Sequence, residues 1–150
     1  MITQKCLYCY ESLENSDKDF HTKCSKSFFG FPHLPLLEVN LFDIESLALN
    51  ILGRSVSVTG VQPKLSIDME KGKKEPARLT IVGLWGSYIL KPPHKNFPQM
   101  PENEDLTMKL ATSAGIKTAR HSLIRLKSGE LAYISKRFDR TAKTKLHAED

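Results

Sequence analysis

Three cysteines and one histidine near the start of the chain have the spacing of a metal site. Cys6 and Cys9 are two residues apart in a Cys-x2-Cys pair, and after eleven intervening residues His21 and Cys24 form a His-x2-Cys pair. Two short chelating pairs supply the ligands of a tetrahedral Cys3His zinc site, which leaves no open position for catalysis. The alternative is a set of buried thiols beside an unrelated surface histidine. We favour a structural Zn2+, because the polar segment between the pairs has too few apolar residues to fold unaided.

A second candidate site combines a lysine with a carboxylate further along the chain. Lys91 ends an apolar run, Tyr-Ile-Leu, that is typical of a strand, and we expect its ammonium group to emerge at the edge of a sheet. Glu104 falls in the first turn of a predicted helix, from where its carboxylate can reach that ammonium group. Protein kinases hold nucleotide phosphates with such a pair. Spacing alone favours the simpler alternative, a solvated lysine and an acid that matches the helix dipole.

The segment SVTGVQPK is rich in hydroxyl groups, turns at Gly60 and returns through Lys64. Backbone amides of such a turn can surround phosphate oxygens, and a lysine adds positive charge. A hairpin that needs one residue at positive φ explains the single glycine equally well. The segment alone therefore leaves both a phosphate-binding loop and an ordinary hairpin open.

The elements that must position these residues follow from the hydrophobic pattern. Residues 25–40 contain Pro32 and Pro35 and read as a connection, and a short helix is expected from Asn40 to Leu52. A helix is predicted from Glu102 to Ala114, because Leu106, Leu110, Ala111 and Ala114 recur at helical spacing. Strands are predicted in the stretches RSVSVTGVQPKLSIDM (two strands), ARLTIV, SYILK, ARHSLIRL and LAYISKRF. The expected fold is α+β, an antiparallel sheet of about five strands with one packed helix, preceded by a small zinc-knuckle-like segment.

Length and composition limit the classes of protein. The 150 residues suffice for one domain, which we divide into a Cys3His segment (1–30), a linker with a short helix (31–53) and a sheet-and-helix region (54–150). With 40% hydrophobic and 26% charged residues, disordered and fibrous classes are excluded. Three cysteines cannot all pair within the chain, and no signal peptide or membrane span is visible, so we expect a cytoplasmic protein without a membrane partner. The net charge of +5 suits phosphate ligands without singling out nucleic acid.

Taken together, several blocks of this sequence resemble one family. The chain is similar to the N-terminal half of the HipA-like serine/threonine kinases, and most of all to the short HipT-type toxins, from about Leu52 to Asp150. Six separated blocks carry the resemblance in the same order and spacing: SVTGVQPKLSI, YILKPP, FPQMPENEDLTMKLA, GIKTARHSLI, ISKRFDR and LHAED.

The resemblance implies a set of roles for individual residues. Val58 to Lys64 would cover the phosphates, Lys91 would hold the α- and β-phosphates, and Glu104 would position Lys91. Lys136 to Phe138 would be the hinge that binds adenine. The implied nucleotide-binding residues are thus Val58, Thr59, Gly60, Lys64, Lys91, Glu104, Lys136 and Phe138. Ser57 and Thr59 correspond to hydroxyls that the family autophosphorylates, and a phosphate there would make the loop compete with ATP.

The resemblance also implies cofactors and partners. The ligand would be ATP with Mg2+, but the family's catalytic Asp and its metal ligands lie in a helical C-terminal lobe, and neither Asp139 nor Asp150 has a matching context. We therefore expect this chain alone to be inactive. We favour a fragment over a natural split protein, because a sheet edge and the hinge would otherwise stay uncovered. The expected partners are the C-lobe, antitoxins including a DNA-binding one, and an aminoacyl-tRNA synthetase as substrate.

Two other functions are weighed against a kinase toxin. The chain could be a non-catalytic, zinc-stapled interaction module that regulates a partner kinase, in which case Lys91→Ala would leave nucleotide binding unchanged. A zinc-dependent nucleic-acid binder is the weaker alternative, and it predicts a steep salt dependence of binding.

Overall fold

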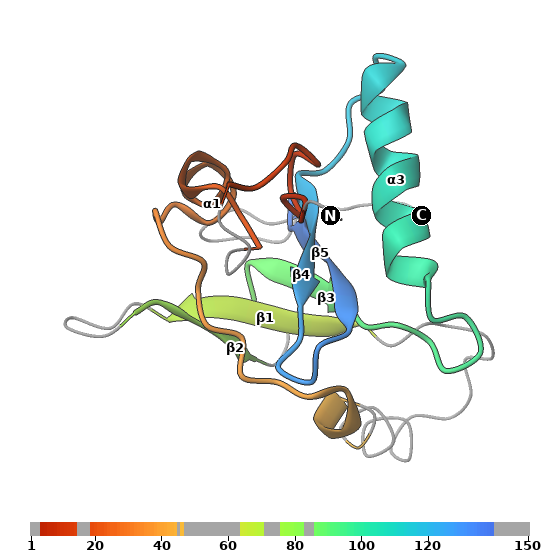
Figure 1. The fold of residues 1–150 in the computed structure, drawn as a ribbon. Helices are drawn as coiled ribbons and strands as arrows, with labels where there is room; N and C mark the ends of the chain where they lie inside the picture. The colour runs from red at the N-terminus through yellow and green to blue at the C-terminus, as the bar shows by residue number, and fades with distance from the viewer. Residues whose placement is uncertain are drawn as a thin grey trace.

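Five antiparallel strands form one sheet in the order β2-β1-β3-β5-β4 (Figure 1). The computed structural model describes residues 4–14, 19–44, 46, 64–70, 76–82 and 86–139. The strands are β1 (Leu65–Glu70), β2 (Arg78–Ile81), β3 (Tyr88–Lys91), β4 (His121–Arg125) and β5 (Leu131–Lys136). The predicted α+β class and these five strands are confirmed, whereas the strand expected before Gly60 lies outside the described residues.

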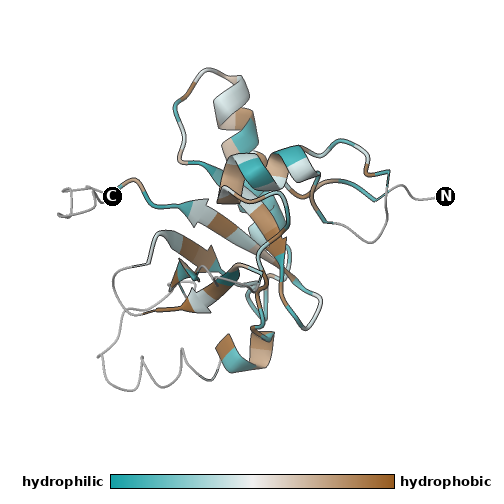
Figure 2. Ribbon diagram, turned by 90° about the vertical axis from the view of Figure 1, so that its left-hand side faces the viewer, coloured by the Kyte–Doolittle hydropathy of each residue, from teal (hydrophilic) through white to brown (hydrophobic). Residues whose placement is uncertain are grey.

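Side chains alternate between the two faces of the sheet, as the pleat of a strand requires. In the central strand β3, Tyr88 and Leu90 are buried on one face, and Ile89 and Lys91 are half-buried on the other. Figure 2 shows the same alternation as hydrophobic and hydrophilic bands along the strands. The sheet therefore has one apolar face, which carries the core, and one mixed face, on which Lys91 lies.

Helix α1 (Thr22–Phe29) covers the apolar face. Phe28 is fully buried, its ring lies 4.7 Å from that of Phe29, and both rings lie about 6 Å from Tyr88 on β3 (5.9 and 6.0 Å). The helix ends at Gly30, which has φ +87° and donates its N–H to the Lys26 carbonyl. The expectation that residues 25–40 are only a connection is thus wrong for residues 25–29, which are helical, and the irregular connection begins at Gly30.

Helix α3 (Met100–Ser113) follows the proline-rich loop and packs against β4 and β5. The predicted helix is confirmed, with Pro101 in its first turn, where proline costs no hydrogen bond. The leucines whose spacing predicted the helix do not form its buried face: Leu106 is 49% and Leu110 is 62% exposed. The buried residues of the helix are Pro101 and Asp105. The contacts between α3 and the sheet therefore include a buried polar one, made by Asp105 to His121 of β4.

The N-terminal segment, residues 4–14 and 19–44, contacts both outer strands of the sheet. Leu36 donates its N–H to the Ala77 carbonyl and accepts a bond from the Leu79 N–H of β2, and the Leu7 carbonyl accepts a bond from the Leu123 N–H of β4. The uncovered sheet edge that we expected is therefore not seen at these positions. Buried residues of the segment and of the sheet belong to one hydrophobic core.

The short helix expected from Asn40 begins as predicted. Residues 41–44 are helical, and the Asn40 side-chain amide donates to the Asp43 carboxylate over 3.0 Å. Most of its remaining predicted length lies outside the described residues. Within the described ranges, no helix is both long enough and apolar enough to cross a membrane.

Candidate functional site

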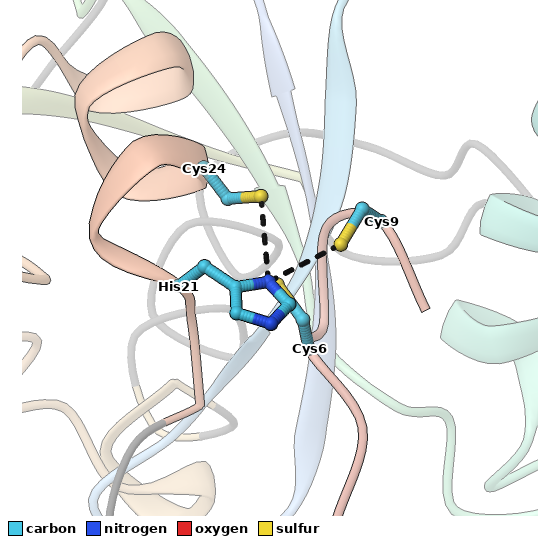
Figure 3. A group of neighbouring side chains, drawn as sticks. All are labelled: Cys6, Cys9, His21 and Cys24. Carbon is cyan, nitrogen blue, oxygen red and sulfur yellow. Dashed lines mark hydrogen bonds between the residues drawn. The ribbon is translucent and has the colours of Figure 1, made fainter. Parts of the chain in front are cut away.

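The four predicted metal ligands converge at the start of α1 (Figure 3). The ligand atoms of Cys6, Cys9, His21 and Cys24 all lie within 4.8 Å of one another. The Nδ1 atom of His21 is 3.4 Å from the Cys9 sulfur and 3.8 Å from the Cys24 sulfur. A tetrahedral Zn2+ with Zn–S bonds of about 2.3 Å separates its ligand atoms by about 3.5–3.8 Å. The cluster thus has the donor set and the size of a structural zinc site.

Backbone hydrogen bonds shape this site before any metal is considered. The loop from Cys6 to Tyr10 is a tight turn, in which the Tyr10 N–H donates to the Cys6 carbonyl over 2.9 Å. On the other side, His21 Nε2 lies 3.0 Å from the Ser12 carbonyl oxygen and must be the donor of that bond. In a neutral ring the Nδ1 atom then carries no proton, and it faces the sulfurs, as a metal-binding histidine requires.

The thiols of the cluster differ in their acidity. Burial raises the pKa of Cys6, but hydrogen bonds from the backbone of Cys9, His21 and Tyr8 outweigh it and lower that pKa to about 7. Burial and the neighbouring Cys9 and Cys6 raise the pKa of Cys24 to about 12. The surroundings therefore favour the thiolate form of Cys6 and disfavour that of Cys24.

The predicted lysine–carboxylate pair is formed. The Nζ atom of Lys91 lies 2.5 Å from Oε1 of Glu104, and the two side chains are only 22% and 28% exposed. Lys91 ends the central strand β3, so the expectation that its ammonium group lies at the sheet edge is wrong. Glu104 is the fifth residue of α3 and belongs to its second turn. The pair joins β3 to α3, and the Lys91 ammonium group also lies 5.5 Å from the centre of the Tyr133 ring.

The other predicted nucleotide-binding residues lie around this pair or outside the described part of the chain. Lys64 is exposed and lies one residue beyond the Leu65–Leu90 pair, beside the end of β3 that carries Lys91. Lys136 pairs with Tyr88 at the opposite end of β3, and Phe138 beyond it is 70% exposed. Outside the described residues lie Ser57, Val58, Thr59, Gly60 and Asp150.

Asp139, which was not predicted to be catalytic, is bound to an arginine side chain. Asp139 accepts two hydrogen bonds from the Arg137 guanidinium group, over 2.8 and 2.6 Å. Each of the two side chains is only 15% exposed, and the hydrogen bonding to Asp139 raises the pKa of Arg137. A carboxylate held by two bonds to its own neighbour is a poor candidate for a base that must accept a substrate proton.

One buried charge escaped the sequence analysis. Asp105 is fully buried beside Glu104, and its two carboxylate oxygens contact Tyr10, His121 and Lys109 at 2.5, 2.7 and 3.2 Å respectively. Burial raises the pKa of Asp105, but the hydrogen bonds from His121 and Tyr10 outweigh it and hold the pKa below its usual range. The sequence signal was faint, because an acid on a helix reads as a solvated residue unless its distant partners are known.

Comparison with known proteins assigns the region that carries the Lys91–Glu104 pair to a protein family. Residues 56–150 match the model of the HipA-like C-terminal domain. The chain belongs to the HipA-like family. It is also 30% identical over 101 residues to a Haemophilus influenzae protein named "Putative kinase", and 36% identical over 107 residues to "Putative kinase Y4dM" of Sinorhizobium fredii.

These matches cover 64% and 63% of this chain but only 28% and 26% of the two relatives. The chain therefore spans about a quarter of the length of the curated relatives that it matches. At the level of the family, it is a HipA-family, kinase-like protein, as the resemblance of its sequence blocks predicted.

Proposed function

We propose that this chain is the nucleotide-binding lobe of a HipA-family serine/threonine protein kinase and that it binds ATP with Mg2+. The observation that carries the proposal is the Lys91–Glu104 contact of 2.5 Å between β3 and α3. A lysine fixed by a helix carboxylate presents a localised positive charge to the α- and β-phosphates. Because both side chains are largely shielded from water, the charge is screened less than that of an exposed lysine.

The positions of the remaining predicted residues support one orientation of the nucleotide. Lys64 lies beside the Lys91 end of β3, and the proposed hinge follows Lys136, which pairs with Tyr88 at the other end. The three residue steps from Tyr88 to Lys91 span roughly 10 Å of strand. Phosphates near Lys91 and a base near residues 136–138 would then lie along one direction of the sheet, with the exposed Phe138 ring available to the base.

Membership of the family supports a wider role. We infer that the complete protein is a toxin of a toxin–antitoxin system that phosphorylates an aminoacyl-tRNA synthetase and so arrests translation. It would be restrained by antitoxins that include a DNA-binding protein, and it would autophosphorylate Ser57 or Thr59. The C-lobe, in the same or a separate chain, would supply the catalytic Asp and the Mg2+ ligands. By this proposal the present chain binds nucleotide without transferring phosphate.

Nucleotide titration tests the proposal. Titrating Mg·ATP into the wild-type chain by calorimetry should show saturable binding, and Lys91→Ala should weaken it at least about tenfold, a difference of about 1.4 kcal/mol. The control is Lys117→Ala, which removes the same charge from an exposed position between α3 and β4. Equal affinities of the wild type and Lys91→Ala would overturn the proposal and favour a non-catalytic interaction module.

We further propose that Cys6, Cys9, His21 and Cys24 hold one structural Zn2+. The donor set, the separations of the ligand atoms and the bond from His21 to the Ser12 carbonyl support this assignment. Purified protein should contain one zinc per chain by elemental analysis, and His21→Ala should lose most of it. His33→Ala, which removes an exposed histidine, should keep it. Zinc retained by His21→Ala as fully as by His33→Ala would contradict the assignment.

A further inference from the structure

The cysteine loop directly contacts the helix that carries Glu104. The Tyr10 hydroxyl, one residue beyond Cys9, donates to the Asp105 carboxylate over 2.5 Å. Asp105 is the residue after Glu104 in α3. A single hydrogen bond, between the residue after Cys9 and the residue after Glu104, therefore connects the proposed metal ligands to the proposed phosphate-binding pair.

A second contact from the same loop reaches α3 one turn further along. The Lys109 ammonium group donates to the Tyr8 carbonyl over 2.8 Å and lies 4.7 Å from the centre of the Tyr10 ring. Leu106 and Leu110 are largely exposed, so these two leucines contribute little to the placement of this helix. Two contacts from the loop, to Asp105 and from Lys109, are thus among those that hold α3 in place.

The backbone of Tyr10 supports a specific role for its side chain. Tyr10 has φ +64°, and among the described residues it is the one non-glycine residue with a positive φ. Glycine adopts this conformation without strain, whereas a bulky side chain does not. A strained tyrosine at this position is explained if its hydroxyl is needed, and that hydroxyl is bound to Asp105.

Asp105 also connects the loop to the lysine through the sheet. Its other oxygen lies 2.7 Å from His121 Nδ1 on β4, and the His121 ring stacks on Tyr133 of β5 at 5.8 Å. Tyr133 is the cross-strand partner of Lys91, and its ring contacts the Lys91 ammonium group. Lys91 is thus linked to Asp105 through Tyr133 and His121, and Glu104 is the residue before Asp105 in the chain.

We infer that the metal-binding loop positions α3 through Tyr10, which makes Tyr10 a positioning residue for the Lys91–Glu104 pair and makes nucleotide affinity depend on the bound metal. The inference rests on the nucleotide-binding and zinc-binding roles proposed above. The described polar contacts of the Tyr10 side chain are with Asp105 and Lys109. Tyr10 acts through Asp105, by fixing the position of the neighbouring Glu104.

Nucleotide affinity of the zinc-loaded full chain tests the inference. Tyr10→Phe removes one hydroxyl and keeps the ring. We expect this variant to bind a fluorescent ATP analogue at least threefold more weakly than the wild type, with an unchanged zinc content. Tyr8→Phe is the matched control, because no described residue hydrogen-bonds to the Tyr8 hydroxyl, and it should bind like the wild type. Equal affinities of Tyr10→Phe and Tyr8→Phe would overturn the inference.

A double-mutant cycle separates positioning from general destabilisation. If Tyr10 acts by placing Glu104, then Tyr10→Phe should cause no further loss of affinity in a Glu104→Gln background, where that carboxylate is already gone. A merely structural role would produce the same fold-loss in both backgrounds. Additive losses would therefore contradict the inference even if the single variant binds more weakly.

Hydrogen exchange tests the placement of the helix without any nucleotide. With zinc bound, amides of residues 100–113 should exchange faster in Tyr10→Phe than in Tyr8→Phe, and removing the metal from the wild type should have the same effect. Unchanged exchange in α3 would overturn the inference. If the wild type binds no nucleotide but α3 exchanges as expected, then the proposed nucleotide role fails while the control of α3 by the loop is supported.

Discussion

Asp105 is a buried charge whose environment stabilises it from three sides. The Tyr10 hydroxyl reaches it from the cysteine loop, His121 from β4, and Lys109 from the next turn of α3. Hydrogen bonds from His121 and Tyr10 together with the Lys109 charge outweigh burial, so the pKa of Asp105 lies below its usual range. A buried carboxylate with this many partners is costly to remove, because its partners stay behind without it.

Asp105→Asn should lower the free energy of unfolding at pH 7 by about 2–4 kcal/mol, since Lys109 and His121 lose a charged partner. The pH dependence has a definite sign. A carboxyl group with a depressed folded pKa stabilises the fold above its unfolded pKa of about 3.9, and this stabilisation is lost as the pH falls through the folded value. Urea unfolding between pH 3 and pH 7 should therefore show a shallower acid decline in Asp105→Asn. The exposed Glu70→Gln is the control, and a loss no larger than that of the control would contradict this role.

At the scale of residues, the sequence predicted groups with a characteristic short spacing and missed contacts between residues that are far apart in the chain. Cys6, Cys9, His21 and Cys24 were found because metal chelation demands fixed residue types at short spacing. The interaction of Asp105 with Tyr10 joins residues 95 positions apart. No spacing rule connects two such residues until the sheet brings them together.

Helix α3 shows that a hydrophobic pattern can predict an element and still mislead about its buried face. Leu106 and Leu110 gave the helical period, yet they are largely exposed, and Asp105 lies inside. The lesson from α1 is the reverse. Cys24, Phe28 and Phe29 lie on its buried side. Residues 25–29 were nevertheless predicted to belong to a connection, because Pro32 and Pro35 follow them. The glycine that ends α1 was the available signal.

Leu110→Ala should therefore change stability little, by less than about 0.5 kcal/mol, as for other exposed positions. The contrast with Asp105→Asn on the same helix is the informative comparison, because a helix packed by its apolar residues would show the opposite order. Chemical denaturation of both variants measures it. A loss above about 2 kcal/mol in Leu110→Ala would show that this face of α3 is packed in the chain.

Packing of α1 on the sheet gives the complementary prediction. Phe28 is fully buried between Phe29, Tyr8 and Tyr88. Phe28→Ala should cost about 3–5 kcal/mol, because it removes a large ring and leaves a cavity. Phe42→Ala removes an equal ring that is 75% exposed and should cost far less. Similar melting temperatures for the two variants would rule out the described core.

At the scale of the whole molecule, the cysteine segment, the sheet and α3 are joined by direct contacts. The segment shares the hydrophobic core with the sheet and contacts the outer strand β4 through Leu7, and Leu36 of the linker contacts the other outer strand, β2. The cysteine loop then reaches α3 around the edge formed by β4, through Tyr10 and through the Tyr8 carbonyl. The sequence predicted the sheet and the knuckle as successive segments, since local patterns describe elements and not the contacts between them.

Labelling with an acyl-phosphate derivative of ATP tests the central claim most directly. In such a reagent a lysine amine beside the phosphates attacks the acyl carbon, an amide bond forms, and ATP leaves. Lys91 is only 22% exposed and ion-paired, so its side chain should react well only when a bound nucleotide brings the reagent to it. Peptide mass spectrometry should find acylated Lys91, and excess Mg·ATP should prevent that labelling. Labelling confined to exposed lysines, or labelling of Lys91 that excess ATP leaves unchanged, would contradict a nucleotide site at the Lys91–Glu104 pair.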